Sequence, residues 1–210
     1  MLGSLRPLDA NHRFWRMLLE DKIRPSPKPP PANTPKNILD VGCGLGSLCL
    51  DMAQEYPTAD VYGIDLKPVP FEPEEIPINC KFVTGCIFTT DAFEPGQFDF
   101  IISRDIRSEI LVDKWGNYVR RLFELLRPGG SVYFVEMDPW PRTDDGSLPA
   151  NDAWVQYSEA MQQMMQADGL HFYGLTENLA ASIESMKPTS KTVTTYHAAV
   201  GKWMRGSFLT

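Results

Sequence analysis

Three glycines at alternate positions, Gly42, Gly44 and Gly46, constrain the fold of this chain more than any other feature. The apolar segment 37–41 before them has the composition of a buried strand, and the segment 47–55 after them has the spacing of a helix. A strand that passes into a helix through several glycines brings backbone N–H groups close to a ligand, because no Cβ stands in the way. The loop therefore predicts a nucleotide-type binding site rather than a simple turn.

The rest of the chain alternates predicted strands with predicted helices. Its strands are apolar almost throughout, which is typical of a parallel sheet that helices cover on both faces. The predicted fold class is therefore α/β, with a doubly wound, mainly parallel sheet. After the glycine loop, strands are expected at 61–66, 80–83, 98–103, 131–136 and 192–197, and helices at 114–126, 154–167 and 176–186, the first of them ending at the Arg127-Pro-Gly-Gly130 turn.

Prolines divide the chain before this alternation begins. Six of the 18 prolines fall in residues 25–35, where missing N–H donors and fixed φ angles favour an extended connector. An amphipathic helix is predicted before it, at 8–23, from apolar residues at helical spacing. The expected organisation is an N-terminal helical segment at 1–24, the proline-rich connector at 25–35 and one binding domain at 36–210.

The balance of charge narrows the choice of partner. A net charge of -7 and a pI near 5.0 argue against binding to nucleic acid or an anionic membrane, because phosphate neutralisation needs clustered Lys and Arg. No basic-then-apolar leader opens the sequence, and no apolar run approaches the ~20 residues of a membrane helix. The four cysteines lack Cys-x-x-Cys spacing, so we expect reduced thiols, no metal site and a cytoplasmic protein.

The carboxylates around the glycine loop favour one class of nucleotide. The loop has the spacing Gly-x-Gly-x-Gly, which differs from the Gly-x-Gly-x-x-Gly fingerprint of dinucleotide sites. Asp40, just before the glycines, would repel a pyrophosphate but suits a sulfonium or an amino group. Asp65 ends the next strand and can accept hydrogen bonds from ribose hydroxyls in either class. S-adenosylmethionine is therefore favoured over NAD, and an NAD-dependent reductase is the more distant alternative.

Four motifs resemble those of class I methyltransferases that use S-adenosylmethionine. They are Ile38-Leu-Asp-Val-Gly-Cys-Gly-Leu-Gly46, Val61-Tyr-Gly-Ile-Asp-Leu66, Phe98-Asp-Phe-Ile-Ile-Ser-Arg104 and Leu125-Leu-Arg-Pro-Gly-Gly130, in the order and spacing of that family. The resemblance implies that the glycine loop holds the methionine moiety and that the end of the second strand holds the ribose and adenine. The residues so implied are Asp40, Gly42, Gly44, Gly46, Asp65 and Leu66.

The end of the third predicted strand departs from the family pattern. The family commonly has an acidic residue there for the adenine amino group, whereas this chain has Gly85-Cys-Ile-Phe88. We therefore expect the backbone of Cys86 and the side chain of Ile87 to flank the adenine ring.

Shorter segments resemble the fungal LaeA-like branch of these methyltransferases. They are 8–12, 133–138, 143–148 and 200–203. The resemblance implies a role in secondary metabolism, either as a tailoring methyltransferase or as a regulator associated with velvet-type proteins. Both ends of the chain are shorter than is usual in that branch. The expected fold therefore has an N-terminal helix before the sheet and a truncated sheet edge at its C-terminal end.

Two functions follow from these features. The first is methyl transfer from S-adenosylmethionine to an oxygen or nitrogen of a small molecule, in particular a secondary metabolite. The second is a catalytically weak or inactive LaeA-like regulator or scaffold that acts through protein partners, with the nucleus as its location. The expected partners are a small-molecule methyl acceptor and, for the second function, another protein or a second copy of the chain.

Methyl transfer requires no catalytic motif, because the cofactor carries the reactive group and the protein supplies positioning. Ligands bind at the carboxyl ends of parallel strands, so the candidates after the fourth and fifth strands are Arg104, Asp105, Glu136 and Asp138. His171 is a further candidate, since imidazole is suited to proton abstraction near neutral pH. The identity of a general base stays open between them.

Two further features bear on protein partners. Met161, Met164 and Met165 recur at helical spacing, which is more typical of a core than of a binding face, although Met-rich faces also bind apolar partners. From Lys187 to Thr210 the chain has four basic residues and no acidic one. Such a segment is typical of a solvated surface and also suits contact with a partner.

Overall fold

The structure is a computed structural model that describes residues 10–19, 36–143, 145–172, 174–196 and 198. The chain divides into two compact units. One spans residues 29–188, and the other combines 1–28 with 189–210. The predicted connector at 25–35 lies outside the described residues, and the domain boundary at residue 36 stays a prediction.

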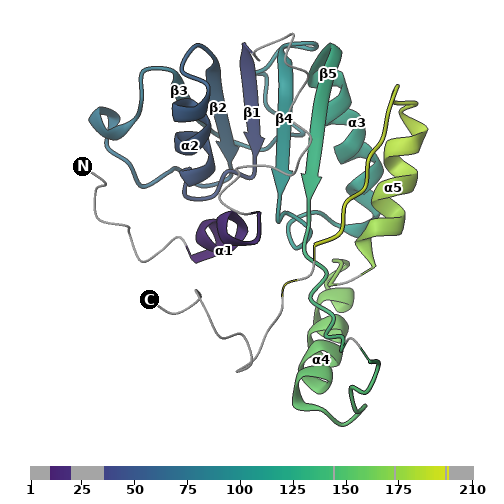
Figure 1. The fold of residues 1–210 in the computed structure, drawn as a ribbon. Helices are drawn as coiled ribbons and strands as arrows, with labels where there is room; N and C mark the ends of the chain where they lie inside the picture. Colours follow the sequence, from purple (N-terminus) through teal and green to yellow (C-terminus); the bar gives the residue numbers. More distant parts are fainter. Residues whose placement is uncertain (1–9, 20–35, 144, 173, 197, 199–210) are drawn as a thin grey trace. The chain divides into compact units, whose positions relative to one another are not determined.

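A parallel sheet forms the centre of the larger unit (Figure 1). Its strands are β1 (Asn37–Val41), β2 (Asp60–Asp65), β3 (Cys80–Thr84), β4 (Phe98–Arg104) and β5 (Leu126–Val135). Their order across the sheet is β3-β2-β1-β4-β5, and every pair of neighbours is parallel. The chain winds outward from β1 to β3 and then crosses back to β4, so the winding reverses between β1 and β4. The predicted doubly wound α/β fold is confirmed.

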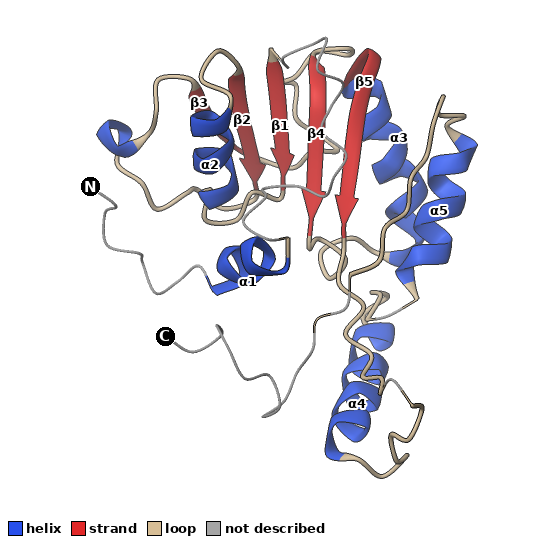
Figure 2. Ribbon diagram, in the orientation of Figure 1, coloured by secondary structure: helices blue, strands red, loops and turns tan. Residues whose placement is uncertain are grey.

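Helices of the same unit flank this sheet or extend from it (Figures 1 and 2). They are α2 (Ser47–Glu55), α3 (Trp115–Leu125), α4 (Ala153–Ala167) and α5 (Leu175–Ser185), with short 3₁₀ turns at Pro73–Glu75 and Val112–Lys114. α2 packs on β2 and β3, whereas α3 packs on β5 and on α5. The predicted N-terminal helix is present in the other unit as α1 (Ala10–Leu18). Among the residues described, no helix combines the length and the apolar character that crossing a bilayer needs.

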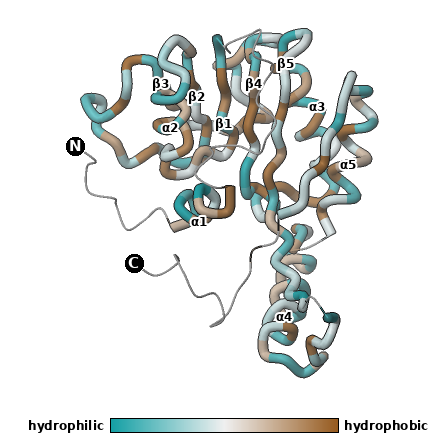
Figure 3. The backbone as a smooth tube through the Cα atoms, viewed as in Figure 1, coloured by the Kyte–Doolittle hydropathy of each residue, from teal (hydrophilic) through white to brown (hydrophobic). Residues whose placement is uncertain are grey.

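Strand β1 explains why the central strands are apolar on both faces. Leu39 and Val41 join the core that α3 and α5 cover, whereas the intervening Asp40 lies toward α2 and accepts a hydrogen bond from Cys49. The strands therefore meet a helical layer on each side, and hydrophobic residues recur along them (Figure 3).

The structure corrects the sequence-based expectation for two segments. The predicted turn at 127–130 lies within β5, where Phe98 pairs with Leu126 and Phe100 pairs with Ser131. The intervening residues shift the register, which a glycine-containing bulge permits without leaving the sheet. The predicted strand at 192–197 is wrong, because residues 192–196 form no strand. In the described part of the chain β5 is thus the edge of the sheet. The truncation of the C-terminal edge stays a prediction.

Candidate functional site

The glycine loop leads from β1 into α2 at the carboxyl edge of the sheet. Gly42, Gly44 and Gly46 have φ angles of 70°, 55° and 82°, a region that other residues enter only with strain. A Cβ on Gly42 would lie 2.9 Å from Ile106, and one on Gly46 would lie 2.9 Å from Phe82. A Cβ on Gly44 would meet nothing within 4 Å. Gly42 and Gly46 are therefore needed both for their φ angles and for the close packing of Ile106 and Phe82. Gly44 is needed for its φ angle alone, and the space beside its backbone is open to a ligand.

Backbone hydrogen bonds hold this loop against the end of β2. The N–H groups of Gly42 and Cys43 both donate to the Ile64 carbonyl, over 2.9 and 3.1 Å. Gly46 is the N-cap of α2 and has no side chain that could accept a hydrogen bond from the first turn. Because no side chain caps this turn, the partial positive charge at the start of α2 is available to a ligand bound over the loop.

Asp65 links the end of β2 to the glycine loop. One carboxylate oxygen accepts a hydrogen bond of 2.8 Å from the Gly44 N–H, and the other accepts one of 3.0 Å from the Lys67 N–H. These two bonds fix the carboxylate beside the loop, and each oxygen keeps a lone pair for a further donor. The neighbouring Leu66 is 67% exposed and offers an apolar surface next to that carboxylate.

Asp40 lies beneath the loop, almost completely buried in β1. Its carboxylate accepts a hydrogen bond of 3.4 Å from the Cys49 thiol. Burial, a hydrogen bond with Cys43 and the negative charge of Asp40 raise the pKa of the Cys49 thiol well above its usual value. The thiol therefore stays protonated and donates to the carboxyl group of Asp40 beneath the loop.

The end of β3 lies next to Asp65 as expected, but its side chains divide between surface and core. The Gly85 N–H donates to the Asp65 carbonyl over 2.8 Å, and Cys86 is partly exposed. Ile87 is only 6% exposed and packs in the core that α3 covers. Phe88, which sequence reasoning did not single out, is 39% exposed. Of the segment 85–88, the accessible side chains are therefore those of Cys86 and Phe88.

The catalytic candidates fall into two places. Arg104 is the last residue of β4, and Glu136 directly follows β5, the neighbouring strand. His171 lies instead in the connection between α4 and α5, where its Nε2 is 3.3 Å from the side-chain amide of Asn178. The sheet thus brings Arg104 and Glu136 to one edge, whereas His171 is held by α5.

Glu136 titrates near neutral pH. Its carboxylate oxygens accept hydrogen bonds of 3.1 and 3.2 Å from the N–H groups of Ile106 and Arg107. Burial is the largest effect on this group and raises the pKa of Glu136 to about 7, with a smaller contribution in the same direction from the charge of Asp105. The hydrogen bonds from Ile106 and Arg107 oppose that shift. Glu136 can therefore take up or release a proton near neutral pH.

Asp105 adopts a left-handed backbone conformation at the same edge. Its φ is 58°, and its N–H donates to the Val135 carbonyl over 2.8 Å. This conformation costs roughly 1–2 kcal/mol in a residue with a Cβ. Strained residues of this kind concentrate at functional sites, so the loop after β4 is a candidate part of the site.

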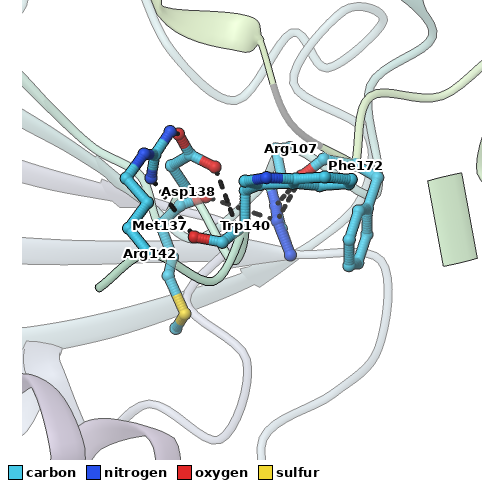
Figure 4. A network of polar contacts seen from close by, with 6 residues as sticks. All are labelled: Arg107, Met137, Asp138, Trp140, Arg142 and Phe172. Atoms are coloured by element: carbon cyan, nitrogen blue, oxygen red, sulfur yellow. Dashed lines mark hydrogen bonds and ion pairs between the residues drawn. The ribbon is translucent and has the colours of Figure 1, made fainter. Parts of the chain in front are cut away.

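Arg107 joins three segments at this edge, and sequence reasoning did not identify it (Figure 4). Its guanidinium donates to the Phe172 carbonyl from Nε at 3.3 Å and from Nη1 at 3.2 Å, and Nη1 lies 3.4 Å from the Met137 carbonyl. The guanidinium carbon is 5.5 Å from the centre of the Phe172 ring. Both oxygen partners belong to the backbone, so no side-chain motif signals this interaction in the sequence.

Further hydrogen bonds stabilise the loops beside Arg107. After β5, Asp138 accepts hydrogen bonds from the Trp140 N–H at 3.1 Å and from the Arg142 guanidinium at 2.7 Å (Figure 4). After β4, the Val112 N–H donates to the Gly169 carbonyl over 2.8 Å. These contacts order the segments that follow the two strands.

The described residues offer no metal centre. No three His, Cys, Asp or Glu side chains among them gather as ligands of one ion, and the four cysteines are free thiols.

Comparisons of sequence associate the chain with methyltransferases. A family described as a methyltransferase domain matches residues 12–174. The secondary metabolism regulator LAE1 of Cochliobolus heterostrophus is 29% identical over 181 residues, covering 77% of this chain and 58% of that protein. The protein-methionine methyltransferase laeA of Emericella nidulans is 37% identical over 143 residues, covering 67% of this chain and 36% of that protein. The chain thus spans less than two thirds of these relatives, and the LaeA-like resemblance is confirmed.

Solved structures support the same fold. A phosphoethanolamine N-methyltransferase of Haemonchus contortus, in complex with S-adenosylhomocysteine, superposes with a TM-score of 0.56 and 22% identity. The match covers 75% of this chain and 34% of that protein.

Proposed function

The chain belongs to the methyltransferase domain family, and from this premise we propose that it binds S-adenosylmethionine and transfers its methyl group to an acceptor. The contact between Asp65 and the Gly44 N–H carries the proposal. It joins the acidic end of β2 to a loop of positive-φ glycines, which places a ribose-binding carboxylate beside open backbone.

The residues of this edge fit the proposed cofactor. Asp65 has lone pairs for the two ribose hydroxyls, and the exposed Leu66 and Phe88 are apolar surfaces suited to an adenine ring. The buried Asp40 lies under the loop, and a carboxylate there favours a cationic methionine moiety over a pyrophosphate. S-adenosylmethionine supplies an electrophilic methyl group when bound, so the residues of the chain need to bind, orient and exclude water.

The acceptor side of the site is assigned to the loops after β4 and β5. Asp105, Arg107 and Glu136 order these loops, and Glu136 is the group with a pKa suited to accepting a proton from an oxygen or nitrogen acceptor. We propose a small molecule, such as a secondary metabolite, as that acceptor. The name of the Emericella nidulans relative supports a methionine of a protein as a second acceptor class.

A second function is that of a regulator acting through protein partners. The name of the Cochliobolus heterostrophus relative supports it. A regulator of secondary metabolism would act in the nucleus, whereas a tailoring methyltransferase would act in the cytoplasm. Incubation with S-adenosylmethionine that is radiolabelled in its methyl group separates these possibilities. Label in small molecules indicates a metabolite acceptor, label in protein indicates a protein acceptor, and no transfer indicates a regulator without methyl transfer.

Calorimetric titration with S-adenosylmethionine tests the proposal directly. We expect saturable binding by the intact chain, and at least about tenfold weaker binding by Asp65→Ala, because hydrogen bonds to a charged carboxylate contribute about 1.5–3 kcal/mol. Asp60→Ala is the matched control, since Asp60 lies at the opposite end of β2 and pairs on the surface with Lys81. Absence of binding by the intact chain, or equal binding by both variants, would refute the proposal.

A further inference from the structure

Helix α4 turns its large apolar side chains outward. Trp154, Tyr157 and Met164 are 51%, 58% and 61% exposed, and their spacing places them on one face together with the partly buried Met161. We call these four residues the α4 stripe. The rings of Trp154 and Tyr157 lie 6.4 Å apart, so the aromatic part of the stripe is continuous. Met164 is therefore on the surface and not in the core that its spacing suggests.

The inward face of α4 is more polar than the stripe. Val155 and Ser158 are buried on it, and Gln162 follows one turn later. The Ser158 hydroxyl and the Gln162 side-chain carbonyl oxygen are buried without a hydrogen-bond partner in the part of the chain that the structure describes. A surface helix ordinarily buries its apolar face and exposes its polar one. The reversal in α4 indicates that the stripe is a surface that another molecule covers.

The position of α4 leaves this surface accessible. Figure 1 shows the helix extending beyond the carboxyl ends of β4 and β5, away from the helices that cover the sheet. The stripe also lies outside the contacts of Arg107, which involve the connection at Phe172. A molecule bound along α4 would therefore not have to displace the packed layers.

The surrounding charge selects the occupant. Residues 143–186 contain seven acidic side chains and no Lys or Arg. Asp168 directly follows α4, is exposed, and lies four positions after Met164 on the face of the stripe, whereas the exposed Glu159 lies on the opposite face of the helix. We propose that the α4 stripe binds a basic amphipathic segment of a partner protein, with apolar side chains against Trp154 and Tyr157 and with Lys or Arg beside Asp168. An acidic partner or an anionic lipid surface would meet like charge.

A model peptide tests this assignment. The probe is a fluorescein-labelled helical peptide of leucine and lysine only, and its twin carries glutamate in place of lysine. Fluorescence anisotropy with the full chain is expected to show binding of the lysine peptide, weakened by added salt, and no binding of the twin. The triple variant Trp154→Ser, Tyr157→Ser, Met164→Ser is expected to bind the lysine peptide at least about tenfold more weakly, because buried aromatic anchors dominate such interfaces.

The matched control removes two exposed polar residues of the same helix. Gln163→Ser with Gln166→Ser changes α4 outside the stripe and is expected to leave peptide affinity unchanged. Circular dichroism of both variants checks that the fold persists, which the exposure of all five positions favours. Equal binding of the two peptides, or equal binding by the triple variant and the wild type, would overturn the proposal.

Two other occupants are distinguished by the same proteins. Sedimentation of the wild type as a dimer that the triple variant abolishes would assign the stripe to a second copy of the chain and overturn the partner proposal. Flotation with phosphatidylcholine vesicles that depends on the stripe would assign it to a membrane surface, with the same consequence. None of these measurements requires methyl transfer, so their outcome is independent of the proposed activity.

Discussion

Gly44 combines a required conformation with access for a ligand. Its φ is 55° and a Cβ there would meet no atom of the chain within 4 Å. Gly44→Ala should therefore lower the free energy of unfolding only by the strain of a left-handed residue, about 1–2 kcal/mol. Its larger effect should be on S-adenosylmethionine binding, because the methyl group occupies the space beside the loop backbone.

Gly129 provides a matched comparison for this prediction. It also has positive φ, at 79°, and a Cβ there would likewise meet open space, but it lies in the bulge of β5. Gly129→Ala should destabilise the fold to a similar extent and leave cofactor affinity unchanged. Urea denaturation and calorimetry of both variants separate the two effects. Equal loss of affinity in both variants would mean that general destabilisation, and not the loop, controls binding.

Glu136 predicts a pH dependence of stability. Its pKa is raised from 4.5 to about 7 in the folded chain, chiefly by burial. Between these values the folded chain retains a proton that the unfolded chain has released, so the contribution of this group to the free energy of unfolding falls as pH rises from about 4.5 to about 7. The shift corresponds to about 3 kcal/mol.

Glu136→Gln should remove this contribution, because glutamine does not ionise. The free energy of unfolding of the variant minus that of the wild type should be larger at pH 8 than at pH 5. Any loss of hydrogen bonds affects this difference equally at both pH values. Urea denaturation at the two pH values measures the difference, with Glu177→Gln on the exposed surface of α5 as a control for losing a carboxylate. The same difference from wild type at both pH values would contradict the assigned pKa.

At the scale of elements, Arg107 fixes the connection between α4 and α5 to the loop after β4. Arg107→Met would leave the Phe172 and Met137 carbonyls without these donors, which costs about 1–3 kcal/mol when such groups stay buried. Hydrogen exchange of amides 169–172 should become faster, while the glycine loop stays protected. Arg142→Met is the control, because its ion pair with Asp138 is exposed and contributes less than about 1 kcal/mol. Equal exchange in both variants would rule out the anchoring role.

The elements that could be predicted from the sequence are those whose signals are local. Strands β1 to β4 were predicted because helices cover both faces of the sheet and leave long apolar runs. The start of β5 was missed, because Pro128 and Gly129 are typical of a turn and only pairing with β4 keeps them in the sheet. The partners of Arg107 were missed because backbone carbonyls have no sequence signature, and Phe172 lies 65 positions away along the chain. The placement of Ile87 beside the adenine stays a prediction. Its packing in the core that α3 covers is a tertiary contact, which no local pattern specifies.

At the scale of the molecule, the candidate cofactor site is assembled at the ends of three adjacent strands. The glycine loop follows β1, Asp65 ends β2 and Cys86 follows β3, and the hydrogen bonds from Gly44 and Gly85 to Asp65 join all three. The sheet order brings these segments together although they are separated along the chain. Binding of a ligand across them should therefore stabilise the whole unit and not the loop alone.

The thermal stability of the chain should report this coupling. A ligand at about 100 times its Kd stabilises the folded state by about 2.7 kcal/mol, which corresponds to a rise in Tm of roughly 5–10 °C for a chain of this size. Differential scanning fluorimetry with S-adenosylmethionine should show that rise in the wild type and in Asp60→Ala, and a much smaller one in Asp65→Ala. NADH should give no shift, because the loop lacks the dinucleotide spacing and the buried Asp40 disfavours a pyrophosphate. A ligand raises the Tm only if it binds the folded state in preference to the unfolded state. A rise in Tm with NADH and none with S-adenosylmethionine would therefore assign the site to a dinucleotide.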